Sequence, residues 1–133
     1  MKKEVSILKM INNDEIFYEF IRKLRNDPRV KSGFIQKKNV TKKQQQAYME
    51  KYKNNYHICT IAGRPAGYIG VIDGDIRIAT HPSMQGKGVG KFMVKFVMKK
   101  YKNIQAKVMF DNEPSMKLFK SSGFKLKYYI LEP

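Results

Sequence analysis

The chain has 133 residues, of which 42% are hydrophobic and 12% aromatic. We expect one folded domain over residues 1–133 that buries its core without metal or disulfide support. The formal net charge is +16, from 27 basic and 11 acidic residues, and it favours polyanionic ligands. Nucleic acid is a possible partner on charge alone, but no zinc knuckle, RRM signature or helix-turn-helix pattern supports it.

The cysteine content and the apolar runs indicate the compartment. One cysteine, Cys59, excludes an internal disulfide framework, and its apolar surroundings predict a buried side chain rather than a nucleophile. Charged residues such as Glu4 interrupt any signal-peptide core near the start. The longest apolar run, 66–72, is too short to cross a bilayer. We therefore expect a cytoplasmic protein that has no membrane partner.

The first part of the chain predicts a short strand over 5–8 followed by a helix. Asn12 and Glu15 resemble a capping box that would begin this helix. Asn26-Asp27-Pro28 would end it. One helix face would carry the apolar residues at helical spacing, which are Ile16, Phe17, Phe20, Ile21 and Leu24.

A polar connection over 29–40 leads to a second predicted helix. Thr41 and Gln44 form the second candidate capping box, and the helix would extend to about Lys53. The helix is followed by a strand at 57–62 and a turn at Gly63-Arg64.

The middle of the chain predicts a hairpin. Strands over 66–72 and 75–80 are separated by Asp73-Gly74, which is a strong two-residue turn signal. These strands would lie side by side in an antiparallel pair.

The last part alternates helices and strands. A helix would begin after a glycine-rich run at 85–90, since apolar residues from Val89 to Val97 recur at helical spacing. A strand is predicted over 104–110, a short helix over 114–121 with Gly123 as its stop, and a last strand over 124–131. The order β-α-α-β-β-β-α-β-α-β predicts an α+β (α/β) fold, with a mixed, mostly antiparallel sheet flanked by helices.

The glycine-rich run Gln85-Gly86-Lys87-Gly88-Val89-Gly90 carries the strongest chemical signal. A strand, a glycine loop and a helix N-terminus together present free N–H groups and partial positive charge, which suits a phosphate or pyrophosphate. The spacing is neither G-x-x-x-x-G-K-[ST] nor G-x-G-x-x-G, so a nucleotide-triphosphate loop and a dinucleotide fold are not indicated.

The run from His81 to Gly90 resembles the acyl-CoA loop of the GNAT superfamily of N-acetyltransferases, [QR]-x-x-G-x-[GA]. A second block, Asn112 to Phe119 followed by Ser122-Gly123-Phe124, resembles the C-terminal signature N-x-x-[AS]-x-x-L-Y-x-x-x-G-F of that family. The two blocks occur in the expected order. The resemblance implies a sheet whose central strands splay apart, and acetyl-CoA as the acyl donor with no metal.

The resemblance also implies which residues bind the donor. Backbone N–H groups of Gln85, Gly86, Lys87, Gly88, Val89 and Gly90 would hold the pyrophosphate, and Lys87 and Lys91 would add charge. Backbone groups of Ile78, Ala79 and Thr80 would pair with the pantetheine arm, and one of their N–H groups would polarise the thioester carbonyl. Thr80 stands where valine is usual. Asn112 would contact the cofactor arm, a role compatible with capping the following helix, and Ser115 would lie nearby.

For the base, the resemblance points to Asp75, where many relatives carry a glutamate that deprotonates the amine. An aspartate is one methylene shorter, so it would need a water relay, and it can also be read simply as the residue after a turn. His57, which could face the acceptor pocket, and His81, which is more easily explained as structural, are the alternatives.

For the acid, the sequence departs from the family pattern, because Phe119 replaces the usual tyrosine and cannot donate a proton. Either the thiolate leaves unaided or another tyrosine serves. Tyr68, Tyr128 and Tyr129 are candidates, and Tyr128 is the predicted acid.

The acceptor is left open among three hypotheses. The first is direct acetyl transfer to a small primary amine such as a nucleotide-linked amino sugar, with Arg25, Arg29 and Lys31 as possible phosphate contacts. These three residues are more readily explained as helix-end cations that the helix dipole favours. The second is the same chemistry on a protein or nucleic-acid amine. The third is a non-enzymatic basic binding module on the same fold. A deep pocket between Arg22 and Tyr52 would favour the first, and an open groove the second.

Overall fold

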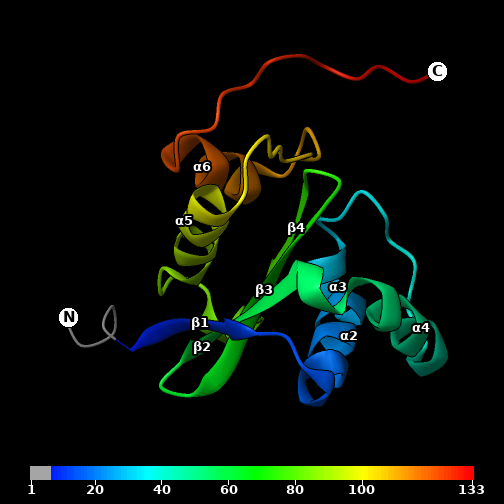
Figure 1. Ribbon diagram of the computed structural model, residues 1–133. Helices are drawn as coiled ribbons and strands as arrows, with labels where there is room; N and C mark the ends of the chain where they lie inside the picture. The colour runs from blue at the N-terminus through cyan, green and yellow to red at the C-terminus, as the bar shows by residue number, and fades with distance from the viewer. Residues whose placement is uncertain (1–6) are drawn as a thin grey trace.

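The computed structural model describes residues 7–133, and it has a four-stranded antiparallel sheet with helices on both faces (Figure 1). The sheet order is β1-β2-β3-β4. The strands are β1 (Leu8–Asn12), β2 (Tyr56–Ile61), β3 (Arg64–Ile72) and β4 (Asp75–Thr80). The helices are α2 (Tyr18–Asn26), α3 (Pro28–Lys31), α4 (Lys42–Tyr52), α5 (Val89–Lys100) and α6 (Glu113–Ser121), with short 3-10 turns η1 (Glu15–Phe17), η2 (Lys53–Asn55) and η3 (Pro82–Met84). The predicted fold class is confirmed.

Two hydrophobic cores cover the two faces of the sheet. On one face α5 lies against the strands, and its buried residues are Val89, Met93, Val94 and Val97. On the other face α2 and α4 contribute Ile21, Leu24 and Met49 (Figure 1). Side chains alternate between faces along a strand, so each strand supplies both cores.

Two tight turns join the three long strands, as predicted for Asp73-Gly74. Asp73 and Gly74 have φ values of 51° and 80°, the left-handed backbone that a type I′ hairpin requires. The β2–β3 turn has the same form at Ala62 and Gly63, with φ values of 50° and 81°. The turn therefore lies one residue earlier than the predicted Gly63-Arg64, and Arg64 begins β3.

The first strand and the first helix cap differ from the prediction. Val5 and Ser6 lie outside the described residues, and the strand observed is β1, which pairs with β2 from Leu8 opposite Ile61 to Asn12 opposite His57. Asn12 is therefore in the sheet and cannot cap a helix. The cap is Asp14, whose side chain accepts from the Glu15 N–H at 2.7 Å.

The α2 helix and the connection after it also differ from the prediction. Ile16 was placed on the buried face but is 78% exposed, because it lies in the tighter η1 turn that precedes α2. The predicted stop at 26–28 is confirmed, yet the chain then forms α3, which Asp27 caps by accepting from the Arg29 N–H. The capping box of Thr41 and Gln44 is present at the start of α4.

The two last predicted strands are wrong. The segment 104–110 makes only one isolated parallel bridge, Asp75 to Gln105, and 124–131 forms no strand. The chain after α6 runs away from the sheet (Figure 1), so 124–131 lies without a neighbouring strand to accept its hydrogen bonds. Residues 106–110 do not continue the pairing with β4 beyond that bridge, because an alternating apolar pattern does not by itself specify a partner. The helix predicted at 114–121 is confirmed as α6, and Gly123 has the left-handed φ of 105° expected of a helix stop.

In the part of the chain that the structure describes, none of the helices has the length and apolar character needed to span a bilayer.

Candidate active site

The glycine loop connects β4 to α5 and leaves the start of that helix open. Gly86 and Gly88 have φ values of 79° and 81°, so both positions need a residue that tolerates left-handed backbone. A Cβ at either position would meet nothing within 4 Å, which means that the loop is open on its outer side. Gly88 is the N-cap of α5 and offers no side-chain cap to the helix N–H groups. Free N–H groups and the positive end of a helix dipole are the features that favour an anion, as predicted for this loop.

The third glycine has a different role. A Cβ on Gly90 would lie 3.3 Å from Leu118 Cδ2 of α6 and 3.8 Å from Thr80 Oγ1. Gly90 therefore allows α5, α6 and the end of β4 to pack closely. Val89, the first residue of α5, is buried in the core. Gln85 and Lys87 are exposed on the loop. Lys87 also lines a pocket of about 370 Å³ together with Ser83, Met84 and the β2–β3 turn.

The outer edge of β4 is open beyond its first residues. The Ile76 N–H donates to the Gln105 carbonyl at 3.0 Å, and the Gln105 N–H donates to Gly74 at 2.8 Å. Within residues 7–133, no further backbone hydrogen bond joins β4 to 106–110. Backbone groups alternate in direction along a strand, so Ile78 and Thr80 face the open edge and Ala79 faces β3. The pairing role predicted for 78–80 is thus available to Ile78 and Thr80.

Both polar atoms of the Asn112 side-chain amide form hydrogen bonds within the protein. Its Oδ1 accepts from the Ser115 N–H at 3.2 Å, and its Nδ2 donates to the Gly33 carbonyl at 3.1 Å. The side chain therefore caps α6 and ties that helix to the connection between α3 and α4. The capping role of Asn112 is therefore observed, and its contact with the cofactor arm, which is compatible with capping, stays a prediction.

Asp75 lies at the opposite end of β4 from the glycine loop, roughly 16 Å away at 3.3 Å per residue. Its Oδ2 accepts from Arg77 Nε at 3.2 Å. Its Oδ1 is buried and has no hydrogen-bond partner among residues 7–133. A buried carboxylate oxygen without a donor is an unusual feature, because such groups are nearly always hydrogen-bonded.

The two histidines have structural partners. His57 packs under α5, where its ring contacts Phe96 at 5.0 Å and its Nε2 lies 2.8 Å from the Tyr101 hydroxyl. Burial, with a smaller contribution from Lys100, lowers its pKa to about 4. His57 faces α5 and not α2 and α4, so the suggestion that it lines the acceptor pocket is wrong. His81 Nδ1 accepts from Ser83 and caps η3.

The aromatic residues considered for proton donation lie in different environments. Phe119 is 5% exposed and stacks edge-on with Phe124 at 5.2 Å, so here it is a core residue. Tyr128 and Tyr129 are 68% and 78% exposed on the chain after α6. Tyr68 is 3% exposed on β3, directly opposite Ala79 of β4. Burial raises the pKa of Tyr68 above the usual range of a phenol, which keeps its proton in place.

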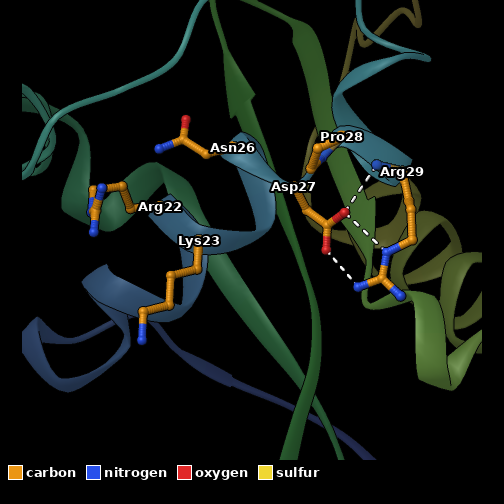
Figure 2. Close-up of a pocket in the computed structure, with 6 residues that line it drawn as sticks. All are labelled: Arg22, Lys23, Asn26, Asp27, Pro28 and Arg29. Carbon is orange, nitrogen blue, oxygen red and sulfur yellow. Dashed lines mark hydrogen bonds and ion pairs between the residues drawn. The ribbon is translucent and has the colours of Figure 1, made fainter.

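The corner between α2 and α3 carries an open pocket of about 480 Å³ (Figure 2). Arg29 donates to Asp27 at 2.7 and 3.1 Å, and this pairing lowers the pKa of Asp27 to about 2. Arg22 is held by Glu19 and by the Val40 carbonyl, and it points away from Asp27 and Arg29 in Figure 2. Asn26 holds Val40 through two further hydrogen bonds. Most side chains of this pocket therefore stabilise the corner.

A cluster that the sequence did not reveal lies on the face covered by α2 and α4. Tyr56, Tyr68 and Arg77 come from three adjacent strands, and Arg25 and Tyr48 reach them from α2 and α4. Only Tyr68 and Arg25 were considered from the sequence. The alternation of Asp75, Arg77 and Ala79 predicts that they share a face, but their position beside Tyr56 depends on strand register.

The acetyltransferase (GNAT) family model matches residues 18–124, and the chain belongs to this family. The prediction of an N-acetyltransferase is thereby confirmed at the level of the family. Among proteins of curated function, none matches the chain at the sequence level.

Solved structures agree on the fold. Spermidine N-acetyltransferase from Vibrio cholerae, in complex with CoA and spermine, is similar with a TM-score of 0.83 at 17% identity, over 96% of this chain and 86% of that chain. The putative acetyltransferase yncA from Salmonella typhimurium, with its cofactor acetyl-CoA, has a TM-score of 0.76 at 18% identity, over 92% and 82%. AAC(6')-Iy, in complex with the bisubstrate analogue CoA-S-monomethyl-acetylneamine, has a TM-score of 0.70 at 16% identity, over 95% and 96%.

Proposed function

We propose that this protein transfers an acetyl group from acetyl-CoA to a primary amine by direct attack. The observation that carries the proposal is the open glycine loop at the uncapped start of α5, next to the free edge of β4. Membership of the family supports the same conclusion. Acetyl-CoA would supply the activated acetyl group as a thioester.

The residues present fit that donor. The N–H groups of 85–90 would bind its pyrophosphate, and the open backbone groups of Ile78 and Thr80 would bind the pantetheine arm as an added strand. An arm that follows β4 from the loop runs toward Asp75. The backbone N–H of Ile78 is our candidate for polarising the thioester carbonyl, because it faces the open edge.

Asp75 is the proposed base. The family position suggests it, and its buried, unpartnered Oδ1 supports it. That oxygen would accept a proton from the attacking amine, directly or through a water. Arg77, bound to the other oxygen at 3.2 Å, would hold the carboxylate in position.

For the proton that the departing thiolate takes up, Tyr68 now has better support than Tyr128. Tyr68 is fixed beside β4, whereas Tyr128 lies on an exposed segment. Release of the thiolate without a protein acid is the alternative, because a thiolate is a weak base that water can protonate.

The acceptor is proposed to be a small amine, with a nucleotide-linked amino sugar as the most specific candidate. Some structural neighbours are named for small-molecule acceptors, spermidine in one case. The open shape of the pocket at 22–29 favours the second hypothesis, a protein or nucleic-acid amine. The charge of +16 is what favours a non-enzymatic nucleic-acid module, which would bind DNA in a salt-sensitive way without acetyl-CoA affinity.

The test is free-thiol release from acetyl-CoA across polyamines, amino acids, amino sugars with and without a nucleotide, peptides and nucleic acid, with acetyl-CoA binding measured in the same samples. Turnover with one class would establish the reaction and the acceptor type. Absence of acetyl-CoA binding would contradict the proposal.

Asp75→Asn tests the base. We expect kcat to fall roughly 100-fold with acetyl-CoA affinity unchanged, the order of magnitude of general-base catalysis. Asp73→Asn is the matched control, because Asp73 lies in the adjacent turn at a φ that asparagine tolerates. An Asp75→Asn enzyme with the same kcat across the pH range would remove Asp75 from this role.

A further inference from the structure

Five side chains converge on the sheet face under α2 and α4, and we call them the tyrosine–arginine face: Arg25, Tyr48, Tyr56, Tyr68 and Arg77. The Tyr48 and Tyr56 hydroxyls are 2.7 Å apart. The Tyr56 and Tyr68 rings are 5.8 Å apart, and the Arg25 guanidinium lies 5.5 Å from the centre of the Tyr48 ring.

The strand register explains why Arg77 belongs to this face. Tyr56 of β2 is opposite Gly70 of β3, and Gly70 is opposite Arg77 of β4. The Tyr56 ring fills the space above Gly70, since a Cβ there would lie 2.6 Å from Tyr56 Cε1. The phenol therefore leans across the sheet in the direction of Arg77.

The arginines of this region differ in how they are neutralised. Arg22 is paired with Glu19, and Arg29 with Asp27. Within the described residues, Arg25 has no carboxylate partner, and Arg77 uses only its Nε on Asp75. Two guanidinium groups thus meet one carboxylate on this face, and the face keeps a net positive charge beside phenols that can donate hydrogen bonds.

The effects on pKa agree with this convergence. Burial raises the pKa of Tyr56 and of Tyr68, while Arg25 lowers both, so Arg25 lies within electrostatic reach of both hydroxyls. Arg77 also lowers the pKa of Tyr68. The phenols consequently remain protonated donors around two cations.

We propose that the tyrosine–arginine face binds an acidic group, a carboxylate or a phosphate, of the amine that is acetylated, with Arg25 and Arg77 as its cationic ligands. This inference rests on the acetyl-transfer function proposed above. Guanidinium groups bind both kinds of anion through paired N–H donors. The amine of the same molecule would face Asp75 Oδ1, which is buried next to Arg77 and has no partner in the described part of the chain.

The acceptor would therefore carry both an amine and an acidic group, as an amino acid or a phosphorylated amine does, and would not be a polyamine. Two guanidinium groups repel a polycation, so this preference is opposite to that expected for the spermine bound in the Vibrio cholerae neighbour. A nucleotide-linked amino sugar satisfies the proposal, but through Arg25 and Arg77 and not through Arg29, which Asp27 already holds.

A binding experiment tests the anion site without any turnover. The arginine Nε–Hε NMR signals would be followed during titration with inorganic phosphate and with phosphoethanolamine, and assigned with Arg25→Gln and Arg77→Gln. We expect saturable shifts of the Arg25 and Arg77 signals and weaker binding in both variants. Lys99→Gln, on the exposed side of α5, removes the same charge elsewhere and should leave the binding unchanged.

A kinetic experiment tests the acceptor class with matched pairs: phosphoethanolamine against ethanolamine, and β-alanine against β-alaninamide. The first pair tests a phosphate group and the second a carboxylate group, so the two pairs show which acidic group the site prefers. We expect a higher kcat/KM for the acidic member of at least one pair. That preference should fall roughly 10- to 100-fold in Arg25→Gln, which is the contribution expected of a hydrogen bond to a charged group, and recover partly in Arg25→Lys.

The inference requires both results. Stationary Arg25 and Arg77 signals, or equal rates with acidic and neutral members, would overturn it even if acetyl-CoA binds and amines are acetylated. Anion binding at these arginines without acetyl-CoA affinity would instead contradict the proposed function and leave the anion site standing.

Discussion

The two faces of the sheet are built from different chemistry. The face under α5 is mainly aliphatic, with Ile69, Val71 and Ile76 of the strands against Met93 and Val97 of the helix. The face under α2 and α4 contains Tyr56 and Tyr68, together with guanidinium groups at its edge.

This difference suits the two faces to different roles: the α5 face to supporting the donor loop, and the α2–α4 face to recognising the acceptor. The α5 face positions the glycine loop, whose proposed binding groups are backbone N–H groups and would therefore need only a rigid helix beneath them. The α2–α4 face presents side chains that differ in charge and hydrogen bonding. We therefore expect substitutions on the first face to change stability and donor binding, and those on the second to change the choice of acceptor.

The largest effect is expected at the glycine loop. Gly88→Glu places a carboxylate at the anion site on a left-handed backbone, and we expect acetyl-CoA affinity to fall at least roughly 100-fold from like-charge repulsion. Isothermal titration calorimetry measures the acetyl-CoA affinity of each variant. Gly123→Glu is the matched control, because Gly123 also has a left-handed φ, of 105°, an added Cβ there would be no closer than 3.9 Å to another side chain, and it follows the C-terminal end of α6. Equal losses of affinity in both variants would contradict the site assignment. Gly90→Glu is a weaker test, because it also clashes with Leu118.

The second prediction concerns the pH dependence of the α5 face. His57 has a pKa of about 4 in the folded protein and 6.5 as its ordinary value, so the unfolded chain binds more protons between these limits. The free energy of unfolding should thus fall as the pH drops from 6.5 to 4, by up to about 3 kcal/mol. Urea unfolding at several pH values measures this slope. His57→Gln should reduce it and His81→Gln should retain it, because His57 is still present; the same slope in both variants would contradict the assignment.

A pair of glycines in β3 compares the two faces directly. An added Cβ at Gly70 would meet the Tyr56 ring at 2.6 Å, whereas one at Gly67 would meet Met93 Cε at 2.9 Å and the Ala79 carbonyl at 2.7 Å. Each alanine substitution should cost about 1–3 kcal/mol by overpacking. Gly70→Ala should raise the KM of the acceptor and leave acetyl-CoA affinity unchanged, because it displaces Tyr56. If Gly67→Ala raised the acceptor KM equally, the two faces would not be functionally distinct.

The smallest effect is expected at the start of α4. Thr41→Ala removes the capping box and should lower the free energy of unfolding by about 1 kcal/mol, as measured by thermal or urea unfolding. Lys42→Ala, one residue later and exposed, is the control and should have little effect. A cost well above that of an N-cap would mean that Thr41 has a further contact.

Local signals predicted the parts of the fold that depend on nearby residues. The Asp73-Gly74 turn, the Thr41 cap and the α5 helix are each specified within a few positions, and each is observed. The prediction of strands at 104–110 and 124–131 was wrong, because a strand depends on a partner that the local pattern does not specify.

The candidate site follows the same division. The glycine loop could be found from six consecutive residues. The tyrosine–arginine face could not, because Tyr56, Gly70 and Arg77 are brought into one row only by the pairing of three strands. His57 was misplaced for a related reason, since a residue at a strand start can point to either face.

The contact between Asn112 and Gly33 has a consequence for folding. The two residues are separated by 79 positions, and their hydrogen bond joins the connection after α3 to the last helix. A contact of such length closes a large loop of chain, which makes it slow to form compared with the hairpins of the sheet. We therefore expect the hydrogen-bonded amides of this connection, Gly33 and Phe34, to gain protection from hydrogen exchange late in refolding, after the central strands have paired.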